Sequence, residues 1–483
     1  MAANIPRSAE VNIEGASANK NRAETPSGQF RLLTDKISIS SAPDSKKDRP
    51  VITEKRNNSP AVCCDDPFSS CVCLKADLHS HTVYGDGTFG FDPSAAYESA
   101  AAPFADRPGG KHKLDVLAVT EHGLHLHKQY DKSDTEIDEW DSTIKAAKKA
   151  NENYDDFYAV TGFEWTPINI ENKHVEKNYG HINVLGSKDF CDVRHEGNGN
   201  CKTLITSLDD FYKWCLGNED SLYGGKIVCQ FNHPTAYPSS NHFNQLALPA
   251  LPPEDLKRLK EIFGLCEVGS PKTKELSWFT YEGIGDGENP VKSNEYWYRM
   301  ALSKGWKVAP VINEDNHLGD YGYSPCRTGI WVNSEKTSAI DKPSIIMEAL
   351  RARRTFASEW DNTLELKYWW TIKSDGQEKK YVMGQTVEEI PKNIDDCTIK
   401  VHVEASSKKK AIGKMSLVII RDYPQEPLEK EFFKTRSREY SGYKEYPIKD
   451  ILCQPDIKAV YLKIERPDRR CAICAPVFNN TCA

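Results

Sequence analysis

Two histidines separated by one residue, His79 and His81, follow a short apolar run of the chain. Alternate side chains of a β-strand point to the same face, so both imidazoles would lie on one side of a strand end. Such a pair is able to chelate a divalent metal ion. Two ordinary half-buried histidines would show the same spacing, so a metal site needs ligands from other segments.

Further metal-ligating residues stand at the ends of later apolar runs. Including His79 and His81, six of the 13 histidines stand at the start or end of an apolar run. His181 stands at the start of its run, and the others stand at or after the end of theirs. Three carboxylates accompany them. Nine nitrogen and oxygen ligands exceed one tetrahedral site and predict two or three ions. The predicted ligands are His79, His81, Asp86, His122, Glu164, His181, His233, Asp315 and His317.

The elements that would position these ligands are seven short apolar runs, at residues 72–79, 115–120, 157–163, 181–185, 227–231, 265–268 and 308–312. Helical patterns lie between most of them, at 93–104, 135–151, 204–216, 253–263 and 293–303. Strands that alternate with helices favour parallel pairing in an α/β fold, and chemistry gathers at the carboxyl ends of barrel strands. Seven strands predict a closed or nearly closed barrel. Residues 166–180 show no helical pattern and are predicted as a loop near the site.

The two ends of the chain have different compositions. Residues 1–72 are rich in Ser, Asn, Lys, Glu and Pro, which predicts a disordered or loosely docked tail. Residues 356–483 contain alternating strand-like runs at 364–370, 398–405, 416–421 and 459–464 with little helix between them, which predicts a β-sandwich. Residues 73–355 would form the metal-binding barrel.

The ordered ligand set resembles the PHP (polymerase and histidinol phosphatase) family of metal-dependent hydrolases over residues 73–355. The resemblance implies a distorted seven-stranded (β/α) barrel with a centre of two or three divalent ions (Zn, Mn or Fe). One ion would be held by His79, His81, Glu164 and Asp315; a second, bridged by Glu164, by His181 and His233; a third by Asp86, His122 and His317.

Two features refine this resemblance. Glu121 stands beside His122 where Asp is usual in the family, which leaves its role open. A PHP barrel followed by a β-sandwich resembles a branch that includes carbamate hydrolases. The segments Phe163-Glu-Trp-Thr166 and Arg353-Arg-Thr-Phe-Ala357 are also similar to that branch.

Metal ions joined by a shared carboxylate would lower the pKa of a bridging water from ~16 towards ~7 and produce a hydroxide nucleophile. The residues predicted to assist this step are Asp315, as proton acceptor or water-positioning ligand, Glu121, and Arg327. Arg327 would clamp a phosphate or carboxylate, although a packing arginine is equally consistent. Weaker candidates are Glu267, to orient a ligand histidine, His125 and His127, as acids or outer donors, and Lys173 and His174, in the loop.

Composition limits the partners. The net charge of −7 argues against general nucleic-acid or membrane-surface binding, and no apolar run is long enough to span a bilayer. The first residues lack the apolar core of a signal peptide, which favours the cytoplasm. The cysteine clusters at 63–73 and 471–482 leave a secreted, disulfide-bonded protein as the alternative.

Three functions are consistent with the sequence. The first is a metal-dependent phosphoesterase whose partner is a small-molecule phosphate ester such as a nucleotide. The second is a hydrolase of a carbamate, ester or amide. The third is a non-catalytic module that keeps its metals for stability and binds a partner. The oligomeric state stays open.

Overall fold

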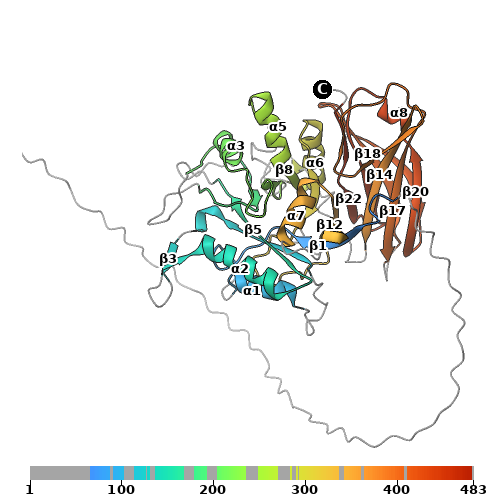
Figure 1. Cartoon of the computed structure of the whole chain (residues 1–483). Helices are drawn as coiled ribbons and strands as arrows, with labels where there is room; N and C mark the ends of the chain where they lie inside the picture. Colours follow the sequence, from blue (N-terminus) through green and yellow to red (C-terminus); the bar gives the residue numbers. More distant parts are fainter. Residues whose placement is uncertain are drawn as a thin grey trace, which may run out of the picture. The chain divides into compact units, whose positions relative to one another are not determined.

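The structure is a computed structural model. It describes residues 66–87, 91–102, 114–126, 128–130, 136–167, 179–192, 204–234, 248–269, 283–284, 290–291, 293–336, 342–359, 364–406 and 411–480. The chain divides into two units, residues 1–59 and 60–483, and all described residues belong to the second (Figure 1). The predicted tail therefore lies almost entirely outside the described residues.

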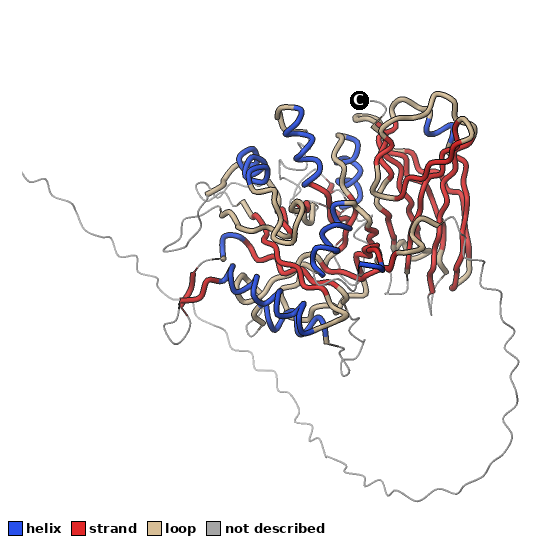
Figure 2. Tube along the Cα trace, in the orientation of Figure 1, coloured by secondary structure: helices blue, strands red, loops and turns tan. Residues whose placement is uncertain are grey.

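All seven predicted strands of the α/β part are present: β1 (Cys71–Asp77), β2 (Val116–His122), β5 (Tyr158–Trp165), β6 (Ile182–Leu185), β7 (Val228–Phe231), β8 (Phe263–Gly269) and β11 (Ala309–Ile312). They neighbour one another in chain order within one sheet, drawn in red in Figure 2. Nearly every residue of the strands β2, β5, β6, β7, β8 and β11 is buried, as expected for a sheet that is covered on both faces. Because the strands are neighbours in the sheet, the ends that carry the predicted ligands lie along one edge of it.

One strand runs against the predicted direction. β6 pairs antiparallel with both β5 and β7, whereas the β1–β2, β2–β5, β7–β8 and β8–β11 pairs are parallel. A parallel strand needs a crossover, usually a helix, and the short 166–180 connection has no helical pattern. The chain therefore re-enters the sheet at the edge where β5 ends. This reversal places His181, just before β6, beside the ends of the parallel strands.

A closed seven-stranded barrel is not found among the described residues. β1 pairs with β2 on one side and with β12 (Arg327–Asn333) on the other, so the edge that would receive β11 is already occupied. The segments that follow β1 and β11 are joined by a single parallel bridge between Ser80 and Asn316. At this bridge the His81 N–H donates to the Asn316 carbonyl at 2.9 Å. The bridge still joins the two segments that carry His79, His81, Asp315 and His317.

Helices lie close to the five predicted positions, with shifted ends: α1 (Pro93–Ala101), α2 (Glu139–Asn153), α3 (Leu208–Gly217), α5 (Pro253–Ile262) and α6 (Asn294–Ser303). Capping residues set several of their starts. Asp92 accepts a hydrogen bond from the Ala95 N–H, and Ser293 accepts one from the Tyr296 N–H. A further helix, α7 (Lys342–Arg351), packs against β12 and has no counterpart in the predicted pattern.

The large sheet continues past β12 into the C-terminal part. Its further strands are β13 (Thr355–Ser358), β22 (Cys471–Cys474), β21 (Ile457–Glu465), β18 (Gly413–Arg421) and β19 (Leu428–Thr435), with β23 (Val477–Asn479) and β16 (Thr386–Val387) beside them. A second, antiparallel sheet has the order β15 (Gln377–Val382), β14 (Glu365–Ser374), β17 (Asp396–Ser406) and β20 (Glu439–Pro447). The four predicted strands of this region are β14, β17, β18 and β21.

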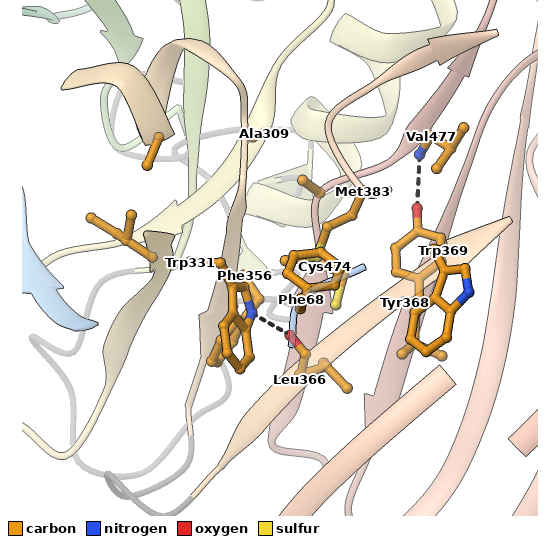
Figure 3. Packing of buried hydrophobic residues seen from close by; sticks show 14 of the residues in the cluster. Phe68, Ala309, Trp331, Phe356, Leu366, Tyr368, Trp369, Met383, Cys474 and Val477 are labelled. Carbon is orange, nitrogen blue, oxygen red and sulfur yellow. Dashed lines mark hydrogen bonds between the residues drawn. The ribbon is translucent and has the colours of Figure 1, made fainter. Parts of the chain in front are cut away.

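The two sheets share one apolar core. The buried Tyr368 of β14 donates a hydrogen bond to the Val460 carbonyl at 2.7 Å. It also accepts one from the Val477 N–H at 2.7 Å, which is drawn in Figure 3. The Trp331 indole of β12 donates to the Leu366 carbonyl at 3.0 Å. A buried aromatic side chain stabilises the fold by roughly 1.5–3 kcal/mol, so this core firmly joins the two parts.

The remaining described elements are short: η1 (Gly123–His125), β3 (Lys128–Tyr130), β4 (Glu136–Asp138), β9 (Gly283–Ile284), β10 (Pro290–Val291), η3 (Ser334–Lys336) and α8 (Lys449–Leu452). Cys471 and Cys474 are free thiols, whereas Cys63, Cys64 and Cys482 lie outside the described segments. Within the same segments, no helix has the length and apolar character needed to cross a membrane.

Candidate metal centre

The structure brings all nine predicted metal ligands together at the rim of the large sheet. They form four overlapping groups, in each of which the ligand atoms lie within 4.8 Å of one another. The groups are His79, His81 and Asp315; His79, Glu164 and His233; His122, Glu164 and His181; and His81, Asp86, His122 and His317. We call the last set the outer group.

The first pair of histidines is fully buried and converges on Asp315. The Nε2 atoms of His79 and His81 lie 3.2 Å apart, and Asp315 Oδ1 is 3.4 Å and 3.2 Å from them, respectively. Asp315 has a positive φ of 48°, which is uncommon for a residue other than glycine. The backbone at this position is therefore held by its surroundings to aim the carboxylate at the histidine pair.

Glu164, at the end of β5, lies at the middle of the cluster. Its Oε1 atom is 3.3 Å from His79 Nε2, 3.1 Å from His181 Nδ1 and 3.4 Å from His233 Nε2. Its Oε2 atom is 2.8 Å from His122 Nδ1. One buried carboxylate thus faces four imidazoles from separate segments, which is the arrangement needed for a carboxylate shared between two ions.

The outer group connects the buried part of the cluster to solvent. Its Asp86 and His317 side chains are 48% and 27% exposed, whereas its member His81 is fully buried, as are His79 and Glu164. Asp86 Oδ1 lies 3.1 Å from His317 Nε2, and its Oδ2 lies 3.7 Å from His122 Nε2. A substrate arriving from solvent would therefore meet the outer group first.

The carboxylates of the cluster are held in their charged form. Burial alone would raise the pKa of Glu164 and of Asp315, but the surrounding histidines hold both pKa values well below the usual range. Burial would lower the pKa of His122, yet Glu164 and Asp86 raise it to about 10. Burial lowers the pKa of His181 to about 4. Metal ions that bind at this cluster would displace protons from the imidazoles, because a ligating histidine is neutral.

Two buried atoms show that the cluster fits a cation. Within the described residues, His81 Nδ1 and Glu121 Oε2 make no hydrogen bond, although both are buried. Buried polar atoms without partners are costly and usually signal an unseen ion or water. Together with the mixed imidazole and carboxylate donors, which suit Zn, Mn or Fe, they fit the predicted divalent ions.

A buried amide network beneath the ligands was missed at the sequence level, apart from Glu267. Glu267 Oε1 lies 3.1 Å from His79 Nδ1, and its Oε2 accepts a hydrogen bond from the His233 N–H at 2.6 Å. These are the contacts that its predicted orienting role requires. The Asn232 amide donates to Glu164 Oε1 at 2.7 Å and also contacts Asn183. Further members are Gln230 and Asn313. The sequence feature that could have identified these residues is an amide side chain within or directly after an apolar strand.

Arg327 does not occupy the predicted position of a substrate clamp. Its side chain is buried, pairs with Glu314 at 3.0 Å and donates to the Gly322 carbonyl at 2.7 Å. These contacts direct the guanidinium into the protein interior. Arg327 instead holds Glu314, the residue before Asp315, so the structure supports the packing alternative.

Some of the other predicted site residues belong to the described part of the chain, and some do not. Glu121 is buried next to His81 but belongs to none of the four groups. The His125 ring is centred 5.9 Å from that of His122, at the partly exposed side of the cluster. His127, Lys173 and His174 lie outside the described side chains.

Comparison with known proteins adds one distant structural likeness. No protein-family model and no curated protein sequence matches the chain. It is similar to a solved two-domain protein containing a predicted PHP-like metal-dependent phosphoesterase from Bacteroides vulgatus ATCC 8482, at 14% identity and a TM-score of 0.37. The match covers 85% of this chain and 96% of the other. Fold and site define this chain as a mixed α/β protein with a candidate metal centre.

Proposed function

We propose that this protein is a metal-dependent hydrolase that acts on small phosphate esters. The observation that carries the proposal is the position of Glu164, whose two carboxylate oxygens face four histidines from separate segments. A purely structural polar core would not need so many histidines around one ionised carboxylate. Clustered ligands of this kind are the hallmark of hydrolytic sites with two or more metal ions.

The roles of the residues follow from their positions. Divalent ions bound here would lower the pKa of a coordinated water and stabilise negative charge on the substrate. Glu164 would be shared between two ions, while Asp315 and the first histidine pair hold one of them. The depressed pKa of Asp315 keeps this carboxylate ionised, which suits a metal ligand that positions the attacking water better than a group that accepts its proton.

The balance of charge favours a phosphate ester over a neutral carbamate or amide. The four groups contain three carboxylates, namely Asp86, Glu164 and Asp315, and six imidazoles, which are neutral when they bind a metal ion. The buried Glu267 and Glu121 lie behind His79 and His81 and raise the number of carboxylates to five. Three divalent ions would carry six positive charges and leave a positive surplus. Because Arg327 is engaged with Glu314, the surplus charge of the ions would have to neutralise the substrate. A centre with surplus positive charge suits an anionic substrate.

The proposal is tested with purified protein loaded with Mn, Zn or Fe and offered phosphomonoesters, phosphodiesters and carbamates. Phosphate-ester hydrolysis that disappears in Glu164→Ala and His233→Ala, with unchanged far-UV circular dichroism, is expected. Turnover of carbamates alone would replace the proposed substrate class by the predicted alternative. Silence across all substrates and metals would favour the non-catalytic binding module.

A further inference from the structure

Asp86, the most exposed member of the outer group, is carried by a tight loop after β1. The Gly85 and Gly87 N–H groups both donate to the Thr82 carbonyl, at 3.1 Å and 2.9 Å. The Thr82 N–H at the base of the loop donates to Glu121 Oε1, in β2, at 2.7 Å. The loop is also held by the Val83 N–H, which donates to the Phe91 carbonyl at 3.0 Å, and by the Tyr84 hydroxyl, 2.9 Å from that of Ser142. Among these anchors, Glu121 is the carboxylate, and it belongs to the strand that ends in His122.

The second oxygen of Glu121 faces a metal-ligating histidine. Glu121 Oε2 is buried and lies 3.7 Å from His81 Nδ1, and neither atom forms a hydrogen bond within the described residues. His79 shows the closed form of the same arrangement, with its Nδ1 3.1 Å from Glu267 Oε1. A carboxylate at Nδ1 fixes the histidine tautomer that leaves Nε2 available for a metal ion.

Gly85 provides the space that Glu121 needs. A Cβ atom at position 85 would lie 2.3 Å from Glu121 Oε2, closer than any real contact. A Cβ at position 87 would meet the backbone of Thr82 instead, at 2.6 Å from its carbonyl oxygen. The two loop glycines are thus required for different reasons, and only Gly85 is matched to the glutamate.

We propose that Glu121 is the positioning residue of the outer group, with Gly85 as its matched partner. One oxygen of Glu121 anchors the Asp86 loop through Thr82, and the other orients His81. The inference rests on the proposed function in one respect, namely that the outer group holds an ion. It goes further because Glu121 lies outside the four ligand groups. In this proposal Glu121 couples the position of the buried His81 to that of the solvent-exposed Asp86.

The test uses the full chain and counts the ions that stay bound as the concentration of a metal chelator rises. Glu121→Gln keeps an acceptor for the Thr82 N–H but presents an amide N–H to His81, which disfavours the ligating tautomer. Glu121→Asp shortens the reach, and Gly85→Ala pushes the carboxylate away. Each variant is expected to lose one ion at 10–100-fold lower chelator concentration than the wild type, with the other ions and the melting temperature retained.

A double-mutant cycle separates this role from general damage to the loop. In the Glu121→Asp background, Gly85→Ala is expected to have no further effect on ion retention, because the shorter carboxylate no longer meets the new methyl group. Gly87→Ala, the matched control, is expected to weaken binding equally in both backgrounds. If Gly85→Ala alone fails to fold, the Gln and Asp variants of Glu121 decide the question.

Two results would overturn the inference. Unchanged ion retention in the Glu121 variants would show that the carboxylate positions nothing, while leaving the proposed function intact. An equal effect of Gly85→Ala in both backgrounds would show that the two residues are not coupled. Wild-type protein that binds no ions would remove the proposed function and this inference together.

Discussion

At the scale of single residues, charge pairing decides which polar groups are available for chemistry. Arg327 and Glu314 illustrate this point. Their side chains are 3% and 6% exposed, and the pair fixes the segment that ends in Asp315 and His317. Sequence spacing predicted that Arg327 would lie near the ligands, but it did not show which residue pairs with its guanidinium. Glu314 directly precedes the predicted ligand Asp315, so nothing in the sequence marked it as the partner of Arg327. The sequence left a substrate clamp and a packing arginine equally open, and the contacts of Arg327 support the packing arginine.

The consequence is testable with the variant R327M. Removal of one partner from a buried ion pair costs about 3–5 kcal/mol, because the other charge stays buried. We expect the free energy of unfolding of R327M, measured by urea denaturation, to fall by this amount. The double variant R327M/E314Q should recover part of the loss. A stability equal to that of the wild type, combined with a raised KM, would instead restore the substrate clamp.

At the scale of elements, the sequence pattern located the seven strands and nine ligands, because apolar runs and their polar ends are local features. The direction of β6 depends on the connection before it, and barrel closure depends on β12, which is more than 200 residues from β1 in the chain. Neither is visible in a local pattern. The sequence analysis did not identify the amide network for the same reason, since only the fold shows that its members are buried. They are Asn183, Gln230, Asn232 and Asn313.

The contact between α6 and β21 supplies a second prediction, on pH. Burial would raise the pKa of Glu295, but Lys463, at 2.8 Å, and Arg299 lower it. A carboxyl group with a depressed folded-state pKa adds stability above the pKa of the unfolded state, near ~4.3, and this stability is lost as the pH falls through the folded-state pKa.

We therefore expect E295Q to lower the free energy of unfolding by about 3–5 kcal/mol at pH 7. The gap between variant and wild type should narrow as the pH falls below about 4. E348Q, which alters the more exposed pair of Glu348 with Arg354, is the control and should change stability little. A constant difference between E295Q and wild type from pH 7 to pH 3 would contradict the assignment.

At the scale of the whole described unit, the large sheet continues from the metal-site strands into the C-terminal part. β12 and β13 connect them, and Trp331 and Phe356 contribute to the shared core. The predicted boundary between residues 355 and 356 falls within β13. A metal-binding part cut at this boundary would lose the strand neighbours and core contacts that support β12.

Truncation tests the interdependence of the two parts. We expect a fragment of residues 60–355 to be insoluble, or to lack a cooperative thermal transition, whereas residues 60–483 retain one. The reason is the loss of the β13–β22 pairing and of the buried contact between Trp331 and Leu366. Cooperative unfolding of the short fragment, followed by calorimetry, would establish the predicted domain boundary instead.

The central claim is that the histidine and carboxylate cluster around Glu164 binds the divalent ions on which hydrolysis depends. The most direct measurement is elemental analysis of the purified protein, coupled to phosphatase assays before chelation, after chelation and after the metal is restored. We predict two or three divalent ions per chain, loss of hydrolysis on their removal and recovery on their return. A chain that binds no such ions, or that hydrolyses phosphate esters equally well without them, would contradict this account.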